Sequence, residues 1–199
     1  MTELVTSALD QIEWPRRTKR LTLRRAGAAD TEATWSFRRL ESVSRWITRA
    51  PQTIDEFRPQ FEDLESLAKT LVIELDGVVI GDLMLRVEDA WAQAEVVDEA
   101  KQVQADLGWC LHPDHTGNGY ATEAVAEMLR ICFEDLGLRR ITANCFADNT
   151  ASWRLMERLG LRREGHAVRE SLHRSGQWLD AYVYALLADE YIESYAPPK

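Results

Sequence analysis

The chain has 199 residues, of which 45% are hydrophobic and 29% are charged, a composition typical of a soluble globular protein. Its 24 basic and 33 acidic residues give a net charge of −9, which argues against a nucleic-acid-binding protein and is compatible with a cationic substrate. No apolar run reaches the roughly 18 residues of a membrane span, and the first residues lack the basic segment of a secretory signal. Cys110, Cys132 and Cys145 are expected to be buried, reduced thiols of a cytoplasmic protein.

The length predicts one domain with a full core. We place this domain at residues 18–190, between an irregular arm at residues 1–17 and a C-terminal tail at residues 191–199. Alternating polar and apolar residues predict a first strand at residues 20–24. Asp30 is expected to cap the helix that follows this strand.

A second helix is predicted to begin at Thr53, because Thr53 and Glu56 have the spacing of a capping box, and its apolar positions run to Leu67. Asp76–Gly77 then joins two apolar segments and is a strong β-hairpin signal. The two strands of this hairpin and the exposed acidic connection after them are expected at residues 70–75, 78–86 and 87–101.

The stretch 103–125 combines a strand, a glycine loop and a helix. Apolar and polar residues alternate up to Leu111, Pro113 ends the strand, and apolar residues with helical spacing resume after the loop. Gly117 and Gly119 would let a ligand approach backbone N–H groups at the start of this helix, where an anion is stabilised. We interpret the stretch as a phosphate-binding loop, with an ordinary tight turn as the alternative.

Two common phosphate-binding motifs do not fit this loop. A nucleoside-triphosphate loop would have a Lys-Ser or Lys-Thr pair after the glycines. A dinucleotide fingerprint would have a third glycine where Thr122 stands.

A second motif covers residues 149–160. Asn149 is a plausible N-cap, Leu155 and Met156 lie on one helical face, and Gly160 ends the helix. The strands around this helix are expected at residues 140–146, 163–173 and 178–187, with a turn at Ser175–Gly176.

The run Thr116-Gly-Asn-Gly-Tyr-Ala121 resembles the Arg/Gln-x-x-Gly-x-Gly/Ala motif of the GNAT acyl-CoA N-acetyltransferases, in which the loop holds the coenzyme A pyrophosphate. The chain departs from the motif at Thr116. The order of elements over residues 18–188 also resembles the GNAT order. The match is most similar to the RimJ/RimL-type branch of ribosomal-protein N-terminal acetyltransferases, through segments such as Arg20-Leu-Thr-Leu-Arg, Ala105-Asp-Leu-Gly-Trp-Cys-Leu-His-Pro and Asp180-Ala-Tyr-Val-Tyr184.

This resemblance implies an α+β, three-layer GNAT fold. Its central sheet would be mixed, with about six to seven strands, helices on both faces and a splayed central strand pair. It also implies an acetyl-CoA-dependent N-acetyltransferase without a metal. The residues implied in cofactor binding are Leu111, His112, Thr116, Gly117, Asn118, Gly119, Tyr120, Ala121, Thr122, Asn149, Ser152 and Met156, with Leu111 and His112 offering backbone groups to the pantetheine amides.

Transfer of an acetyl group to an amine needs a base, because an α-amine (pKa about 8) and still more a lysine-like amine (about 10.4) are largely protonated at pH 7. The resemblance makes Asp106 the first candidate and Glu170 the second; alternatively, each is an ordinary strand acid. Ser152 would donate a hydrogen bond to the leaving thiolate. Many GNAT enzymes place a Tyr general acid where this chain has Met156. Tyr184 is a geometric substitute or a packing residue.

The acceptor is expected to be a primary amine, with a protein or peptide α-amine favoured by the resemblance. A cationic small molecule, such as an aminoglycoside, a polyamine or an amino acid, is the alternative, and a non-catalytic acyl-CoA-binding module is another. Trp46 and Tyr184 are candidates for the acceptor side. Neither nucleic acid nor membrane is an expected partner, and the chain is expected to be a monomer or homodimer.

Two other chemistries are disfavoured. Cys110, His112 and His115 invite a zinc interpretation, but a Pro turn separates His115 from the strand that carries the other two, and no cysteine pair lies nearby. A serine hydrolase would need a Gly-x-Ser-x-Gly elbow.

Overall fold

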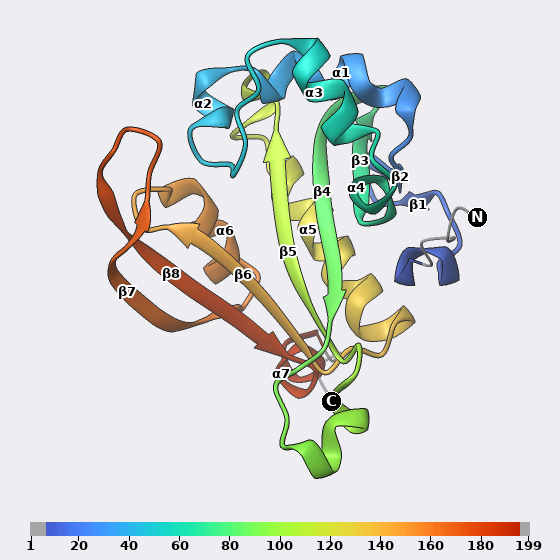
Figure 1. Cartoon of the computed structure of the whole chain (residues 1–199). Coiled ribbons are helices and arrows are strands. Elements are labelled where there is room, and N and C mark those ends of the chain that lie inside the picture. The colour runs from blue at the N-terminus through green and yellow to red at the C-terminus, as the bar shows by residue number, and fades with distance from the viewer. Residues whose placement is uncertain (1–6, 196–199) are drawn as a thin grey trace, which may run out of the picture. The chain divides into compact units, whose positions relative to one another are not determined.

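The computed structural model describes residues 7–195 and has an α+β fold. Its eight strands form a mixed sheet in the order β1-β2-β3-β4-β5-β6-β8-β7, shown in Figure 1. The chain forms two compact units. Among the described residues, the N-terminal unit comprises residues 7–85 and 109–127, and the C-terminal unit comprises residues 86–108 and 128–195. The predicted mixed sheet is confirmed, with eight strands where six or seven were expected. None of the described helices is long and apolar enough to cross a membrane.

Antiparallel strands form the sheet of the N-terminal unit. Leu21 and Leu23, on one face of β2, are almost fully buried, as the alternation predicted. The hairpin at Asp76–Gly77 is confirmed, because both residues have positive φ angles, 50° and 81°, as tight hairpin turns require. The strands are β1 (Arg16–Arg17), β2 (Leu21–Arg25), β3 (Thr70–Leu75) and β4 (Val78–Glu88), followed by the end of β5 (Gln104–Leu111).

Two predicted features of the helices need correction. Asp30 precedes the first helix, but its carboxylate binds the Arg24 guanidinium and the Gly27 N–H instead of capping that helix. The second predicted helix is broken in two, because the Asp63 carboxylate accepts the Ser66 N–H at 3.0 Å and starts a new helix. The helices of this unit are α1 (Thr31–Arg38), α2 (Glu41–Ser44), α3 (Ile54–Phe61), α4 (Leu64–Ala68) and most of α5 (Tyr120–Arg130), with short 3₁₀ turns η1 (Ala8–Gln11), η2 (Ala28–Asp30) and η4 (Pro113–His115).

The predicted irregular arm is partly ordered. Asp10 accepts the Ser7 N–H at 2.9 Å and binds Arg25 at 2.7 Å, which anchors η1. β1 pairs antiparallel with β2. Both elements have local contacts that the sequence reasoning did not use, since Ser7 and Asp10 form a capping box and β1 pairs with Thr22 and Leu23. Residues 1–6 of the arm lie outside the described part.

The C-terminal unit contains the parallel strand pair of the sheet. Its elements are the end of β4, η3 (Ala94–Ala100), most of β5, a π turn (Ile131–Asp135), β6 (Arg140–Phe146), α6 (Thr150–Arg158), β7 (Arg162–Leu172), β8 (Trp178–Leu187) and α7 (Ala188–Tyr195). The β5–β6 ladder pairs Gln104–Asp106 with Arg140–Thr142. Beyond it β6 runs on to Phe146, pairing antiparallel with β8. The ladder therefore covers only the first part of β5.

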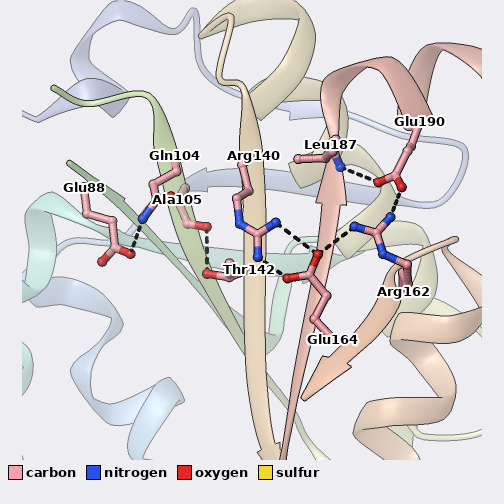
Figure 2. Close-up of polar contacts among 9 residues, drawn as sticks. All are labelled: Glu88, Gln104, Ala105, Arg140, Thr142, Arg162, Glu164, Leu187 and Glu190. Atoms are coloured by element: carbon pink, nitrogen blue, oxygen red, sulfur yellow. Dashed lines mark hydrogen bonds and ion pairs between the residues drawn. The ribbon is translucent and has the colours of Figure 1, made fainter. Parts of the chain in front are cut away.

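A chain of ion pairs joins β6, β7 and α7, as Figure 2 shows. Glu164 binds Arg140 through both carboxylate oxygens and also binds Arg162 at 2.6 Å, and Arg162 in turn binds Glu190. The hydrogen bond from Arg140 is the largest of the effects that lower the pKa of Glu164 to about 2. Glu190 also accepts the Leu187 N–H at 2.9 Å and so fixes the end of β8.

The predicted C-terminal tail begins within a helix. α7 runs to Tyr195, and the Tyr191 hydroxyl donates to Glu134 at 2.9 Å. The tail prediction rested on the last residues, and residues 196–199 lie outside the described part.

Candidate functional site

The glycine loop lies in the N-terminal unit between η4 and α5. Gly117 and Gly119 have φ angles of 78° and 80°, a left-handed conformation that costs side-chain-bearing residues energy. The Glu123 N–H donates to the Gly119 carbonyl at 3.0 Å and closes the first turn of α5. The loop therefore leads directly into the N-terminus of a helix of eleven residues, where free N–H groups and the helix dipole favour an anion.

Two side chains of the loop form hydrogen bonds with backbone carbonyls of the loop and of the turn before it. The Thr116 hydroxyl donates to the Pro113 carbonyl at 2.7 Å, so the side chain at the position where the motif differs is folded back on the preceding turn. The Asn118 amide donates to the Thr116 carbonyl at 3.1 Å. These bonds set the shape of the loop and leave the recognition of an anion to backbone groups.

Arg20 is a site residue that reasoning from motifs did not single out. It precedes β2, but its guanidinium donates to the Asn118 carbonyl at 2.9 Å and to the Glu123 carboxylate at 2.7 Å. It also lies 4.5 Å from the centroid of the Tyr120 ring. The only sequence signal was its place in the segment Arg20-Leu-Thr-Leu-Arg, since its partners are about a hundred residues further along the chain.

At the end of β5, Leu111 and His112 were both expected to offer backbone groups to the pantetheine amides, but their backbone groups point in different directions. The His112 N–H donates to the Ile80 carbonyl of β4 at 2.8 Å, and its carbonyl accepts the His115 N–H at 3.0 Å. Backbone groups of successive strand residues point to opposite edges of a strand. The Leu111 backbone therefore points away from β4, which makes Leu111 the better candidate of the two.

The second motif lies in the C-terminal unit, at the start of α6. The Asn149 side chain accepts the Ser152 N–H at 3.4 Å, which confirms the predicted N-cap. Among the described residues, the Ser152 hydroxyl has no hydrogen-bond partner. Met156 is 1% exposed and carries no proton to donate, so the helix has no acid at the position where many GNAT enzymes have a Tyr.

Asp106 lies on β5, within the C-terminal unit, and its side chain is 16% exposed. Its carboxylate accepts a hydrogen bond from Arg86 at 3.0 Å, which is the ordinary structural arrangement of a strand acid. Burial raises the pKa of Asp106, the Arg86 charge opposes this shift and the Glu88 charge adds to it, so the pKa lies above its usual value. A raised pKa suits a carboxylate that must take up a proton.

The remaining predicted residues differ in their surroundings. Glu170 is exposed and bonds Ser171 at an irregular part of β7. Tyr184 is fully buried, and its hydroxyl donates to Glu157 at 2.8 Å and accepts from Arg163 at 3.0 Å. This network favours the packing alternative for Tyr184. In the N-terminal unit, the Trp46 ring lies 4.4 Å from the Arg45 guanidinium carbon.

Cys110 is 8% exposed. Burial, with a smaller contribution from the Asp82 charge, raises the pKa of its thiol to about 12, so the thiolate that zinc prefers is disfavoured. Within residues 7–195, no three His, Cys, Asp or Glu side chains are grouped as metal ligands would be.

Comparison with known families identifies the class of protein. A family model described as an acetyltransferase (GNAT) domain matches residues 20–162. The chain therefore belongs to the GNAT acetyltransferase family. YjcK of Bacillus subtilis, described as a probable N-acetyltransferase, is 37% identical over 134 residues, which cover 67% of this chain and 68% of YjcK.

Other similar proteins include one whose name states a substrate class. The L-amino acid N-acetyltransferase AaaT of Escherichia coli is 30% identical over 117 residues, 59% of this chain and 67% of AaaT. The structure of Mycobacterium smegmatis RimJ in complex with CoA-disulfide has a TM-score of 0.71 and 26% identity, covering 85% of this chain and 83% of that chain. Two further curated relatives are 36% identical, but the chain spans only about half of their lengths, 50% and 49%.

Proposed function

We propose that the protein transfers the acetyl group of acetyl-CoA to a primary amine by direct attack in a ternary complex. The observation that carries the proposal is the glycine loop at the start of α5, with Gly117 and Gly119 in left-handed conformations, in a chain that belongs to the GNAT family. Backbone N–H groups from Gly117 to Thr122 would bind the pyrophosphate, because such groups stabilise an anion at a helix N-terminus.

Each unit has further candidates for contacts to acetyl-CoA. In the N-terminal unit, the Leu111 backbone would bind the pantetheine arm. In the C-terminal unit, Asn149 and Ser152 would bind the thioester end.

The reaction forms a C–N bond and breaks the C–S bond of the thioester. Asp106, acting through a water molecule, would accept the proton that the amine loses, and its raised pKa supports this role. The thiolate leaves with a hydrogen bond from the Ser152 hydroxyl, which has no other partner among the described residues. Glu170 is the second candidate base, and its side chain is exposed to solvent.

We propose a protein or peptide α-amine as the acceptor. Its pKa of about 8 leaves far more neutral amine at pH 7 than a lysine side chain, with a pKa of about 10.4, would have. The resemblance of the sequence motifs to the RimJ/RimL-type branch supports this choice. A free amino acid or another cationic small molecule is the second candidate, favoured by the similarity to AaaT and by the net charge of −9.

The test is an acetyl-transfer assay that follows release of free coenzyme A. The acceptors are a peptide with a free N-terminus, the same peptide with a blocked N-terminus and an internal Lys, free amino acids, and an aminoglycoside or polyamine. We expect turnover with the free N-terminus and little with the blocked peptide. Turnover with amino acids or polycations alone would support the second acceptor class.

A binding measurement separates loss of catalysis from loss of the cofactor site. Acetyl-CoA at a hundred times its Kd should stabilise the protein by about 2.7 kcal/mol, which raises Tm measurably. Binding without turnover on any acceptor would favour an acyl-CoA-binding module. No stabilisation by acetyl-CoA or CoA would refute the proposal.

A further inference from the structure

Arg20 contacts the glycine loop from a distant part of the sequence. Its Nη1 donates to the Asn118 carbonyl at 2.9 Å and its Nε donates to Glu123 at 2.7 Å. The guanidinium carbon lies 4.5 Å from the centroid of the Tyr120 ring. One side chain thus contacts the loop, the first residue of α5 and an acid one turn into α5, and all three lie in the N-terminal unit.

The bond from Arg20 to Asn118 determines which way the next N–H group points. In a trans peptide the carbonyl of one residue and the N–H of the following residue point in opposite directions. Because Arg20 holds the Asn118 carbonyl, the Gly119 N–H points away from Arg20. In the described part of the chain, the Gly119 N–H has no hydrogen-bond partner, so it is available to an anion on the side of the loop opposite Arg20.

The negative charge of Glu123 must also be balanced if the loop is to bind an anion. It lies in the first turn of α5, where an unpaired carboxylate would repel a bound anion. Its two oxygens accept bonds from the Thr18 hydroxyl at 2.6 Å, the Arg20 N–H at 2.8 Å and the Arg20 Nε at 2.7 Å. Burial raises the pKa of Glu123, but these bonds outweigh burial and keep the pKa below its ordinary value. The carboxylate is therefore ionised, and Arg20 balances its charge.

Thr116 does not supply either function. Its hydroxyl donates to the Pro113 carbonyl at 2.7 Å, and a threonine has no positive charge. We propose that Arg20 is a positioning residue of the pyrophosphate loop, which orients the Gly119 N–H toward the phosphates and balances the charge of Glu123. This inference rests on the proposed function, because it assumes that the loop binds the pyrophosphate of acetyl-CoA.

The test compares two cofactors in Arg20→Gln, Arg20→Lys and a control, Arg17→Gln. Arg17 is an exposed neighbour in β1 whose side chain bonds Thr22 at 3.5 Å, so its replacement causes the same change of charge without touching the loop. Acetyl-CoA has the pyrophosphate, whereas S-acetylpantetheine has the same thioester and pantetheine amides without it. The Kd and kcat/KM of each are measured for every variant, together with Tm.

We expect Arg20→Gln to weaken acetyl-CoA binding about tenfold, equivalent to about 1.4 kcal/mol, and to leave kcat/KM for S-acetylpantetheine unchanged. Arg20→Lys should restore part of the affinity, because an ammonium balances Glu123 but lacks the planar fork that spans two acceptors. Arg17→Gln should bind both cofactors as the wild type does.

The outcomes separate this inference from the proposed function. If wild-type protein does not bind acetyl-CoA, the proposed function is refuted and the inference with it. If the wild type binds acetyl-CoA and Arg20→Gln binds it equally well, only the inference is refuted. Equal losses for acetyl-CoA and S-acetylpantetheine would also overturn it, because Arg20 would then support the fold in general.

Discussion

Removing the charge of Arg86 and removing the charge of Glu88 should shift the pH dependence of catalysis in opposite directions, because both charges lie near Asp106. The Arg86 Nη2 lies 3.0 Å from the Asp106 carboxylate, and Arg86 also lies 3.4 Å from Glu88. The Arg86 charge lowers the pKa of Asp106 and the Glu88 charge raises it, against a background of burial that raises it most. Arg86→Gln should therefore raise the pKa of Asp106 and move the acidic limb of the rate profile to higher pH. Glu88→Gln should move that limb to lower pH.

The size of the shift follows from the geometry. Two unit charges about 4 Å apart interact by about 4 kcal/mol at an effective dielectric constant of about 20. The Arg86 side chain is 51% exposed, so solvent screening reduces this to about 1 kcal/mol. One pKa unit corresponds to about 1.36 kcal/mol, and we expect Arg86→Gln to shift the limb by about 0.7 pH units.

The assay is kcat and kcat/KM for the best acceptor between pH 4.5 and 9, in the wild type, Arg86→Gln, Glu88→Gln and Asp106→Asn. Arg86→Lys is the matched control, because it keeps the charge. The acceptor is the same throughout, so its own titration cancels in the comparison. If Asp106 is the base, Asp106→Asn should lower kcat by about 10²- to 10⁴-fold. Wild-type kcat in Asp106→Asn would refute the assignment of Asp106 as the base, and so would an acidic limb that moves in neither charge variant. In that case Glu170→Gln is measured in the same assay, and a loss of kcat in that variant would transfer the assignment to Glu170.

Three further predictions test the fold and the site. A methyl group on Gly81 would lie 2.5 Å from the Cys110 carbonyl oxygen, so Gly81→Ala should lower the free energy of unfolding, measured by denaturant titration, by about 3 kcal/mol. The control Gly27→Ala, where an added methyl group would have nothing within 4 Å, should change this free energy by less than about 0.5 kcal/mol. Equal effects of the two variants would contradict the close contact at Gly81. Ser152→Ala should lower kcat about tenfold or more and leave the acetyl-CoA Kd unchanged; an unaltered kcat would exclude a hydrogen bond to the thiolate. The folded-state pKa of Glu164 is lowered to about 2, below its unfolded value, so the stabilisation that Glu164 gives is complete above about pH 4.3 and is lost as the pH falls toward 2. Glu164→Gln should therefore lower the free energy of unfolding by about 1 kcal/mol at pH 7 and by little at pH 2. A loss that does not depend on pH would show that the charge of Glu164 does not matter.

Local signals predicted the elements of the fold well. The hairpin at Asp76–Gly77 needs only the φ angles of two residues, and the caps at Thr53 and Asn149 need only a side chain and an N–H three residues away. Each of these was confirmed because all of its parts lie within a few residues. The break of the second helix at Asp63 was missed for a related reason: Asp63 is a good N-cap, but the apolar spacing continued through it.

Contacts between different elements could not be predicted in the same way. The Asp30 carboxylate binds Arg24 of β2, and the Tyr184 hydroxyl donates to Glu157 of α6. The contacts of Arg20 at the candidate site could not be predicted either, because the motif describes the residues of the loop and not the residues elsewhere in the chain that bind it. In each case a charged or polar partner from another element decides the role.

The departure of this chain from the motif at Thr116 is a change in how the loop is supported. An anion at a helix N-terminus is recognised by backbone N–H groups, so the shape of the backbone matters more than any one side chain in the loop. In this chain the shape is held by the Thr116 hydroxyl on Pro113, by the Asn118 amide, and by Arg20 from outside the loop. In the proposed arrangement, Arg20 outside the loop would take over the task of the Arg or Gln that the motif has within it, by holding the orientation of the peptide between Asn118 and Gly119.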